Sequence, residues 1–280
     1  MSVSGFHVID AHHHVGSLEA IGHVSKDTTQ RTPEEYERVE VETRLAVMDS
    51  LGEDQAIVIP GHGYVRPDGL ADTRRINDAI AAYRDRLPAR FPAAIGVVEP
   101  VYGPRGFEEL ERVKHELRLS GVSFHVRFQG VSTHSPLVLN LVRKMAELDL
   151  VPYIHAIGGH VDENLWKVQE LARAIPATNI LVLDAFSTSE QASEALRVGP
   201  ATPNLLFDTS LCSGFELIEP MIERIGPERV VFGTDQYSAT TPDVRPVRRI
   251  VLQQIVDSGL DRAAKQAILS GNIRRLLGLA

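Results

Sequence analysis

Three consecutive histidines, His12, His13 and His14, follow a short apolar run near the start of the chain. Side chains of an extended segment alternate between its two faces, so His12 and His14 point to one side and His13 to the other. Two neutral imidazoles on one face can bind the same metal ion, and imidazole is the commonest metal ligand. A solvated cluster or an expression tag is the alternative, but tags lack an apolar strand that leads into them. We therefore predict a metal site at these histidines.

Further polar side chains stand at the ends of later apolar runs, namely His125, Arg127, His155, Asp184 and Asp235. A single histidine at such a place is more often a hydrogen-bonded core residue than a ligand. The chain has only 11 histidines, however, and four of them lie at such ends. Together His12, His14, His155 and Asp235 make a set of three nitrogens and one carboxylate. Such a set suits Zn²⁺, or another divalent first-row metal, with a position left for water.

The apolar runs alternate with segments of helical spacing along the whole chain. The runs predicted as strands are 6–11, 55–60, 91–98, 121–128, 150–155, 179–184, 204–208 and 229–235. Helices are predicted at 32–51, with Thr32 as the cap, and at 72–87, 106–119, 135–148, 163–174, 187–198, 214–225, 244–258 and 262–277.

This alternation predicts an α/β protein whose parallel sheet closes into a (β/α)8 TIM barrel, with residues 1–280 as a single domain. A doubly wound open sheet is the alternative, but no Gly-rich phosphate turn follows the first strand. The carboxyl ends of the strands meet at one face of a TIM barrel. The polar residues at the strand ends are therefore expected to converge there.

The bulk composition argues against several classes of partner. The formal net charge is −8 and no basic run stands out, which argues against nucleic acid. Cys212 is the one cysteine, so no disulfide can form within the chain and a reducing compartment fits. No apolar run approaches the ~20 residues of a membrane span, and residues 1–5 lack the features of a signal peptide. We expect a cytoplasmic protein that acts on a small molecule, without membrane or nucleic acid; whether it forms a homo-oligomer is open.

Six segments, in order along the chain, resemble the motifs of one enzyme family. They are Asp10–His14, Asn77 with the stretch to Pro100, Gly121–His125 with Gln129-Gly130, Tyr153–Ala156, Phe232–Asp235 and Gly271–Gly278. The first resembles an Asp-x-His-x-His motif, and the fifth resembles a Phe-Gly-Ser/Thr-Asp motif. On these motifs, the chain resembles the amidohydrolase superfamily, and within it the amidohydrolase-related family of metal-dependent barrels.

The resemblance implies a role for each residue of the metal set. His12, His14 and His155 would bind one divalent metal ion, with Zn²⁺ in first place and Mn²⁺ in second. Asp235 would lie near or on the metal and act as the general base toward the metal-bound water. A divalent cation lowers the pKa of bound water to about 7, and a neighbouring carboxylate can then take its proton.

One position departs from the family pattern. Relatives usually end the sixth strand with a histidine, whereas Asp184 stands here. Asp184 is then an extra metal ligand, a second proton shuttle, an orienter of His155 or His160, or a carboxylate that caps the following helix. The family's lysine ligand also has no match at the fourth strand, where His125 stands, which favours a single metal. Asp235, Asp184 and His125 are the catalytic candidates.

Substrate contacts are predicted beyond the metal set. Arg127 lies two residues after His125, on the same face of the predicted strand. There it would bind a substrate carboxylate through paired hydrogen bonds, unless it forms a salt bridge with Asp184 or Glu99. The other candidates lie on the loops after the second and fifth strands and are His62, Arg66 and His160.

Two classes of enzyme fit these residues. The leading prediction is a metal-dependent hydrolase that uses a metal-activated water on a small carboxylated substrate, such as a lactone, an amide or a ring-cleavage product. The alternative, which the resemblance implies, is a nonoxidative decarboxylase or a hydratase of aromatic-acid catabolism, because such relatives use much the same ligands. A third hypothesis, a barrel that only binds a ligand, is opposed by the complete ligand set.

Overall fold

The computed structural model describes residues 5–15, 33–237 and 245–279. The predicted cap Thr32 lies outside these residues. Among the described helices, none has the length and apolar character that a bilayer span requires.

Parallel strands form the centre of the molecule. They are β1 (Ile9–Val15), β2 (Gln55–Pro60), β3 (Ile95–Val97), β4 (Gly121–Phe124), β5 (Val151–His155), β6 (Ile180–Leu183), β7 (Leu205–Asp208), β8 (Val230–Val231) and β9 (Gln236–Tyr237). Strands β3 to β8 pair in sequence order, and β1 pairs with both β2 and β9. A parallel bridge between Val58 and Ala94 joins β2 to the third strand. The N–H of Ala11 donates to the carbonyl of Phe232 at 3.0 Å and so joins β1 to the end of β8. The predicted TIM barrel is confirmed.

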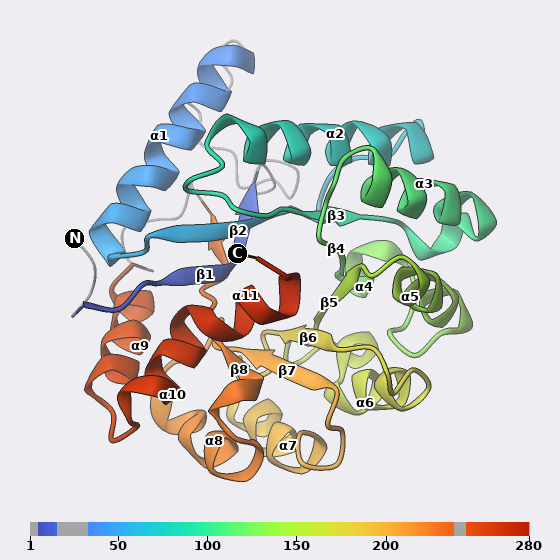
Figure 1. Cartoon of the computed structure of the whole chain (residues 1–280). Coiled ribbons are helices and arrows are strands. Elements are labelled where there is room, and N and C mark those ends of the chain that lie inside the picture. Colours follow the sequence, from blue (N-terminus) through green and yellow to red (C-terminus); the bar gives the residue numbers. More distant parts are fainter. Residues whose placement is uncertain (1–4, 16–32, 238–244, 280) are drawn as a thin grey trace.

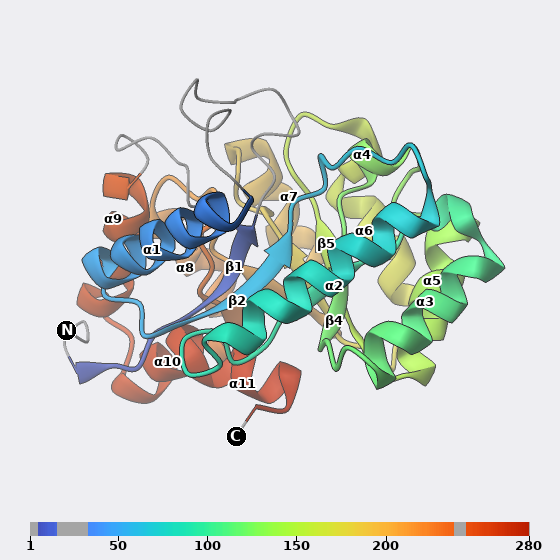
Figure 2. The same cartoon turned by 90° about the horizontal axis from the view of Figure 1, so that it is seen from above.

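Helices surround the strands (Figure 1). The outer ring contains α1 (Pro33–Leu51), α2 (Leu70–Arg86), α3 (Pro104–His115), α5 (Pro136–Glu147), α6 (Leu165–Arg173), α7 (Ser189–Val198), α8 (Glu219–Ile225) and α9 (Arg245–Asp257). Shorter helices are α4 (Val126–Gln129), α10 (Arg262–Gln266) and α11 (Asn272–Leu277). Figure 2 shows α10 and α11 at the end of the barrel away from the tips of β1 and β2.

Two apolar clusters hold the barrel together. The larger one fills the space between strands and helices, and the smaller one fills the barrel itself with side chains such as Ile9, Ile57 and Leu181. Ile273 of α11 belongs to the smaller cluster and is fully buried. Helix α11 therefore closes the N-terminal end of the barrel with apolar side chains. The opposite end is left to polar residues.

Several predicted strands have different limits in the structure, and the eighth covers only Val230–Val231 of the predicted 229–235. The first strand extends to Val15 because its histidines are buried with hydrogen-bond partners and continue the pairing with β2. The third covers only Ile95–Val97, since Pro92 has no N–H to offer a ladder. The fourth ends at Phe124, where the chain turns into α4. The pairing of β9 with β1 was not predicted at all.

We expect Ile273→Ala to lower the free energy of unfolding by about 2–5 kcal/mol, because it removes buried methyl groups from the end of the barrel. Ile250→Ala is the matched control, since Ile250 is 47% exposed, and it should change stability by less than about 0.5 kcal/mol. Chemical denaturation measures both values. An equal effect of the two substitutions would show that α11 does not contribute to the core.

Candidate metal centre

A β-bulge in β1 places the histidines. Asp10 pairs with Ala56 and His13 with Val58, so three steps along β1 match two along β2. Ile9 and Ala11 face the barrel interior. The extra residue then lets His12 follow Ala11 on the same inner side, while His13 turns to the helix layer.

Three imidazoles converge at the carboxyl ends of the strands. The Nε2 atoms of His12 and His14 lie 2.9 Å apart, and those of His155 and His14 lie 3.3 Å apart. All three side chains are buried. Three of the predicted metal ligands, which come from β1 and β5, therefore meet at one point.

In each of these three rings the other nitrogen, Nδ1, already makes a hydrogen bond. Nδ1 of His14 donates to the carbonyl of Pro60 at 3.2 Å, and Nδ1 of His155 donates to the carbonyl of Phe124 at 3.0 Å. Nδ1 of His12 donates to Oδ2 of Asp208 at 2.9 Å. Since carbonyl and carboxylate oxygens accept these bonds, the proton of each neutral ring sits on Nδ1 and the three Nε2 lone pairs face one another.

This arrangement fits a metal ion. Lone pairs at these distances repel each other unless a proton or a cation lies between them. Nitrogen ligands about 2.0–2.1 Å from a tetrahedral zinc are about 3.3–3.4 Å apart, close to the spacing of His155 and His14. Together His12, His14 and His155 form one candidate metal-binding group of the described residues.

Asp235 lies beside the same point. Its Oδ1 is 3.5 Å from Nε2 of His12 and 3.4 Å from Nε2 of His14. Its φ of 55° is in the left-handed region, which Asp tolerates better than most residues. Asp235 follows Thr234, whose N–H donates to Oδ1 of Asp10 at 3.1 Å. The hydrogen bond therefore ties the carboxylate after β8 to the strand that carries the histidines.

The surroundings give the three histidines different charge states. Burial and then the neighbouring imidazoles hold the pKa of His14 and of His155 well below the usual value. Burial also opposes charge on His12, but the hydrogen bond to Asp208 and the charges of Asp235 and Asp184 prevail and raise its pKa to about 9. Without metal, His12 therefore carries a proton at neutral pH while the other two rings are neutral.

Asp208, at the end of β7, was missed by the sequence reasoning. Besides His12, it accepts hydrogen bonds from the N–H of Asp184 at 3.0 Å and from the hydroxyl of Ser210 at 2.6 Å. The sequence does contain a signal for Asp208, because this residue ends an apolar run as the predicted site residues do. A side chain at Gly233 would collide with it, since a Cβ there would lie 2.9 Å from Oδ2 of Asp208 and 3.2 Å from Cβ of His12.

The structure narrows the roles of Asp184. Thr188 caps α7 by accepting from the N–H of Gln191, so the prediction that Asp184 caps this helix is wrong. Nor does it orient His155, whose Nδ1 bonds to a carbonyl. Oδ1 of Asp184 lies 2.7 Å from Oγ of Ser210, whose single hydroxyl proton is shared with Asp208, and 4.0 Å from Nδ1 of His12. It therefore belongs to the His12 side of the site, in a second candidate group with Asp208.

Two more imidazoles border the metal set. The ring of His125 stacks on that of His155, with centroids 4.1 Å apart and planes inclined by 3°. His62 lies 5.3 Å from His155, centroid to centroid, and its Nε2 is 3.0 Å from Oγ of Ser123. Nδ1 of His125 is 2.5 Å from Oε1 of Glu163, a residue that the sequence reasoning also missed. No local pattern marks Glu163, which ends a short helical turn before α6.

Arg127 and Arg66 are placed differently from the prediction. Because the chain turns helical after Phe124, Arg127 lies in α4 and not on the face of a strand; the predicted placement is wrong. Its exposed guanidinium lies 2.7 Å from Nε2 of His160. The predicted alternative, a salt bridge from Arg127 to Asp184 or Glu99, is also wrong. Among the described residues no carboxylate pairs with Arg127, and Glu99 pairs with Arg66 at 2.7 Å. The other end of Arg66 donates to the carbonyl of Phe128 at 2.6 Å.

A buried polar cluster supports β1 from behind. Nε2 of His13 donates to Asp10 at 3.0 Å, and Nδ1 of His13 accepts from Arg44 of α1 at 3.2 Å. Arg44 also donates to the carbonyl of His14 and to Glu40. Since Arg44 is fully buried, these bonds fix the strand against the helix layer. Asp10, His13 and Glu53 form the third candidate group.

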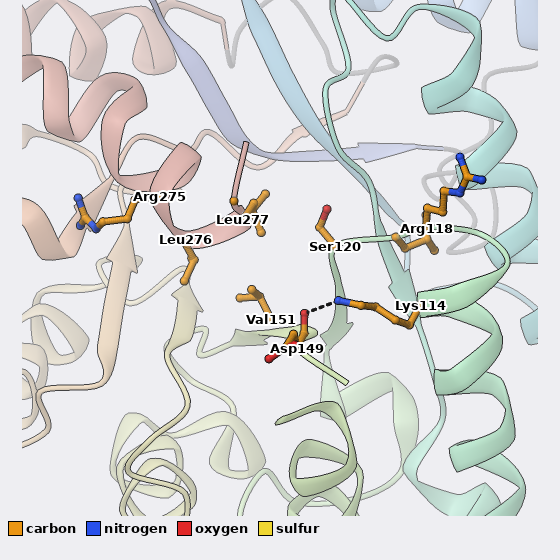
Figure 3. A pocket seen from close by; sticks show the side chains of 10 residues that line it. Lys114, Arg118, Ser120, Asp149, Val151, Arg275, Leu276 and Leu277 are labelled. Atoms are coloured by element: carbon orange, nitrogen blue, oxygen red, sulfur yellow. Dashed lines mark hydrogen bonds between the residues drawn. The ribbon is translucent and has the colours of Figure 1, made fainter. Parts of the chain in front are cut away.

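The pocket in Figure 3 lies at the other end of the barrel. It has a volume of about 600 Å³ and lies before β4 and β5, beside Ser120, Val151 and Leu276. Lys114 donates to the carbonyl of Asp149 at its edge, at 3.1 Å. The converging histidines stand at the carboxyl ends of the strands, so this pocket is separate from the candidate centre.

A family model described as amidohydrolase matches residues 9–279. The chain belongs to the amidohydrolase family. The resemblance predicted from the motifs is therefore confirmed. A comparison of the sequence with curated proteins found no match.

Solved structures of two decarboxylases and a hydratase share the fold of this chain. The 5-carboxyvanillate decarboxylase LigW from Sphingomonas paucimobilis aligns with a TM-score of 0.75 at 17% identity, over 99% of this chain and 100% of that one. The dihydroxybenzoic acid decarboxylase from Polaromonas, which contains manganese and the inhibitor 2-nitroresorcinol, aligns at 0.69 with 18% identity, over 99% and 98%. The 4-oxalomesaconate hydratase LigJ from Rhodopseudomonas palustris aligns at 0.72 with 15% identity, over 97% and 96%. At such identities the likeness shows the fold alone.

Asp208→Asn should weaken binding of Zn²⁺ or Mn²⁺ about 10–100-fold, because it removes the charged acceptor that orients His12. Competition with a chromophoric chelator measures the affinity. Asp257→Asn, on the exposed face of α9, is the matched control and should bind metal like the wild type. Equal affinities for all three proteins would contradict a role of Asp208 in the site.

Metal binding should release about one proton at pH 7, because His12 with a pKa of about 9 must lose its proton to become a ligand. The apparent affinity should fall about tenfold for each pH unit below about 9, and the release should vanish above that pH. Titration of metal into weakly buffered protein with a pH indicator measures the release. No release at pH 7, with metal bound, would contradict the charge state of His12.

Proposed function

We propose that this member of the amidohydrolase family is a metal-dependent lyase, a nonoxidative decarboxylase or hydratase that acts on a small carboxylated substrate of the aromatic or ring-cleavage type. One observation carries the proposal. His125, held by Glu163, stacks directly on the metal-ligand candidate His155. A lyase needs a group that moves a proton to or from the substrate itself, beside the site that holds the substrate's oxygens.

The metal set serves both enzyme classes. His12, His14 and His155, with Asp235 beside them, would hold a single divalent ion, for which we propose Zn²⁺ or Mn²⁺. Such an ion supplies Lewis-acid polarisation of substrate oxygens. The manganese in the similar decarboxylase from Polaromonas supports including Mn²⁺ in the tests.

A metal-dependent hydrolase is the second candidate, and the position of Asp235 favours it. A carboxylate oxygen 3.4–3.5 Å from two of the candidate metal ligands is suited to take a proton from a water molecule. The similar structures are decarboxylases and a hydratase, which supports the lyase over this reaction. Asp235 would then hold or move a proton at the substrate instead of at water.

Arg127 is the better candidate for a substrate carboxylate. Its guanidinium is exposed and contacts His160, whereas Arg66 is held by Glu99 and the carbonyl of Phe128. An arginine without a carboxylate partner among the described residues binds a planar carboxylate through two parallel hydrogen bonds. His62, whose ring stands edge-on to the stacked rings of His125 and His155, would border the substrate.

A substrate panel separates the two reactions. Protein loaded with Zn²⁺ or Mn²⁺ should release CO₂ from, or hydrate, at least one hydroxylated aromatic acid or unsaturated ring-cleavage acid, followed by CO₂ capture and ultraviolet absorbance. Asp235→Asn should lower turnover by at least about 100-fold, while Asp257→Asn should leave it unchanged. Turnover of lactones or amides alone would favour the hydrolase. Failure to bind any divalent metal would overturn both readings.

A further inference from the structure

Glu163 is a buried carboxylate next to the candidate centre. It ends the short helical segment η4 (Val161–Glu163), between β5 and α6, and its side chain is fully buried. Its Oε1 accepts two hydrogen bonds, from Nδ1 of His125 at 2.5 Å and from the backbone N–H of Arg127 at 3.1 Å. The carboxylate thus fixes both the ring and the start of α4.

The arrangement is costly for a purely structural role. Oε2 of Glu163 is buried without a hydrogen-bond partner, and within the described part of the chain no lysine or arginine side chain pairs with this carboxylate. A buried charge without compensation destabilises the folded state. Among the described residues, His125 is therefore the one side chain that can offset the negative charge of Glu163, because its ring can become positive.

The hydrogen bond determines the tautomer of His125. Since Glu163 accepts from Nδ1, the neutral ring carries its proton there and Nε2 keeps a lone pair. Nε2 has no hydrogen bond to another described residue, and the ring lies parallel to that of His155. His62, the other imidazole beside the metal set, bonds to Ser123 and has no carboxylate partner among the residues that the structure describes. Of these two rings, only His125 is oriented in this way.

We propose that Glu163 is a positioning residue, which holds His125 with Nε2 free to accept a proton from the substrate and which balances the charge that results. The step breaks the O–H bond of a substrate hydroxyl and forms an N–H bond at Nε2, and the electron pair of the O–H bond stays on the substrate oxygen. This assignment rests on the proposed lyase function. It narrows the substrate to carboxylic acids that also carry an ionisable hydroxyl, phenolic or enolic.

The tautomer provides a test that does not depend on turnover. In zinc-loaded protein with ¹⁵N-labelled histidine, His125 should show a protonated Nδ1 and an unprotonated Nε2, with its signals assigned from their loss in His125→Gln. Glu163→Ala should move the proton to Nε2 in a large part of the molecules. Glu163→Gln, which keeps an oxygen acceptor, should keep the tautomer. A protonated Nε2 in the wild type, or no change in Glu163→Ala, would overturn the proposal.

Kinetics test the charge separately. Glu163→Gln should lower kcat about 10–100-fold on a hydroxylated acid substrate, with KM within about twofold and the metal content unchanged. Glu109→Gln is the matched control, since Glu109 is a buried carboxylate of α3 that pairs with Arg74, Arg112 and Asn77, none of them a residue of the candidate centre. It should match the wild type in kcat and tautomer. An unchanged kcat in Glu163→Gln would overturn the charge-balancing role.

The two tests separate this proposal from the proposed function. If no acid in the panel is turned over while the tautomer follows Glu163 as expected, the lyase assignment fails and the positioning of His125 stands. If turnover occurs while the tautomer of His125 does not depend on Glu163, the lyase assignment stands and this proposal fails.

Discussion

The centre of this molecule depends on the convergence of three imidazole lone pairs. Each ring is locked by a hydrogen bond at Nδ1, to Asp208, to Pro60 or to Phe124. Two of these acceptors are main-chain carbonyls at the ends of barrel strands, so the backbone fold determines the tautomers of His14 and His155. The rings cannot turn their Nε2 atoms apart without losing these buried bonds. Without metal, the additional proton of His12 at neutral pH relieves part of the repulsion among the lone pairs, and a bound metal ion would replace that proton.

Maintaining that geometry requires support on the outer face of β1. Asp10 and Arg44 hold the backbone on either side of the bulge, through the N–H of His12 and the carbonyl of His14. Both side chains are fully buried and lie in one polar cluster with Glu40 and His13. The outward histidine thus contributes to the site without entering it.

The sequence was sufficient for the barrel and for the three histidines and Asp235 that meet at its mouth, because both follow from local rules. Apolar runs alternate with helical segments, and polar residues such as His155 and Asp235 stand at strand ends. What could not be predicted depends on contacts across the chain. His12 and its partner Asp208 are 196 positions apart, and His125 and Glu163 are 38 apart. Arg127 was misplaced for a local reason, since an apolar run continues past Phe124 while the backbone turns helical.

The bulge in β1 also separates two kinds of structural constraint on side chains within a strand of seven residues. Before it, Ile9 and Ala11 are constrained by the volume of the barrel core. After it, His12 and His14 are constrained only by geometry at the mouth. Losing the one extra residue would exchange the two faces, bringing His13 to the mouth and burying His12 and His14 beneath α1. A single deletion here would thus remove the candidate metal centre from the barrel.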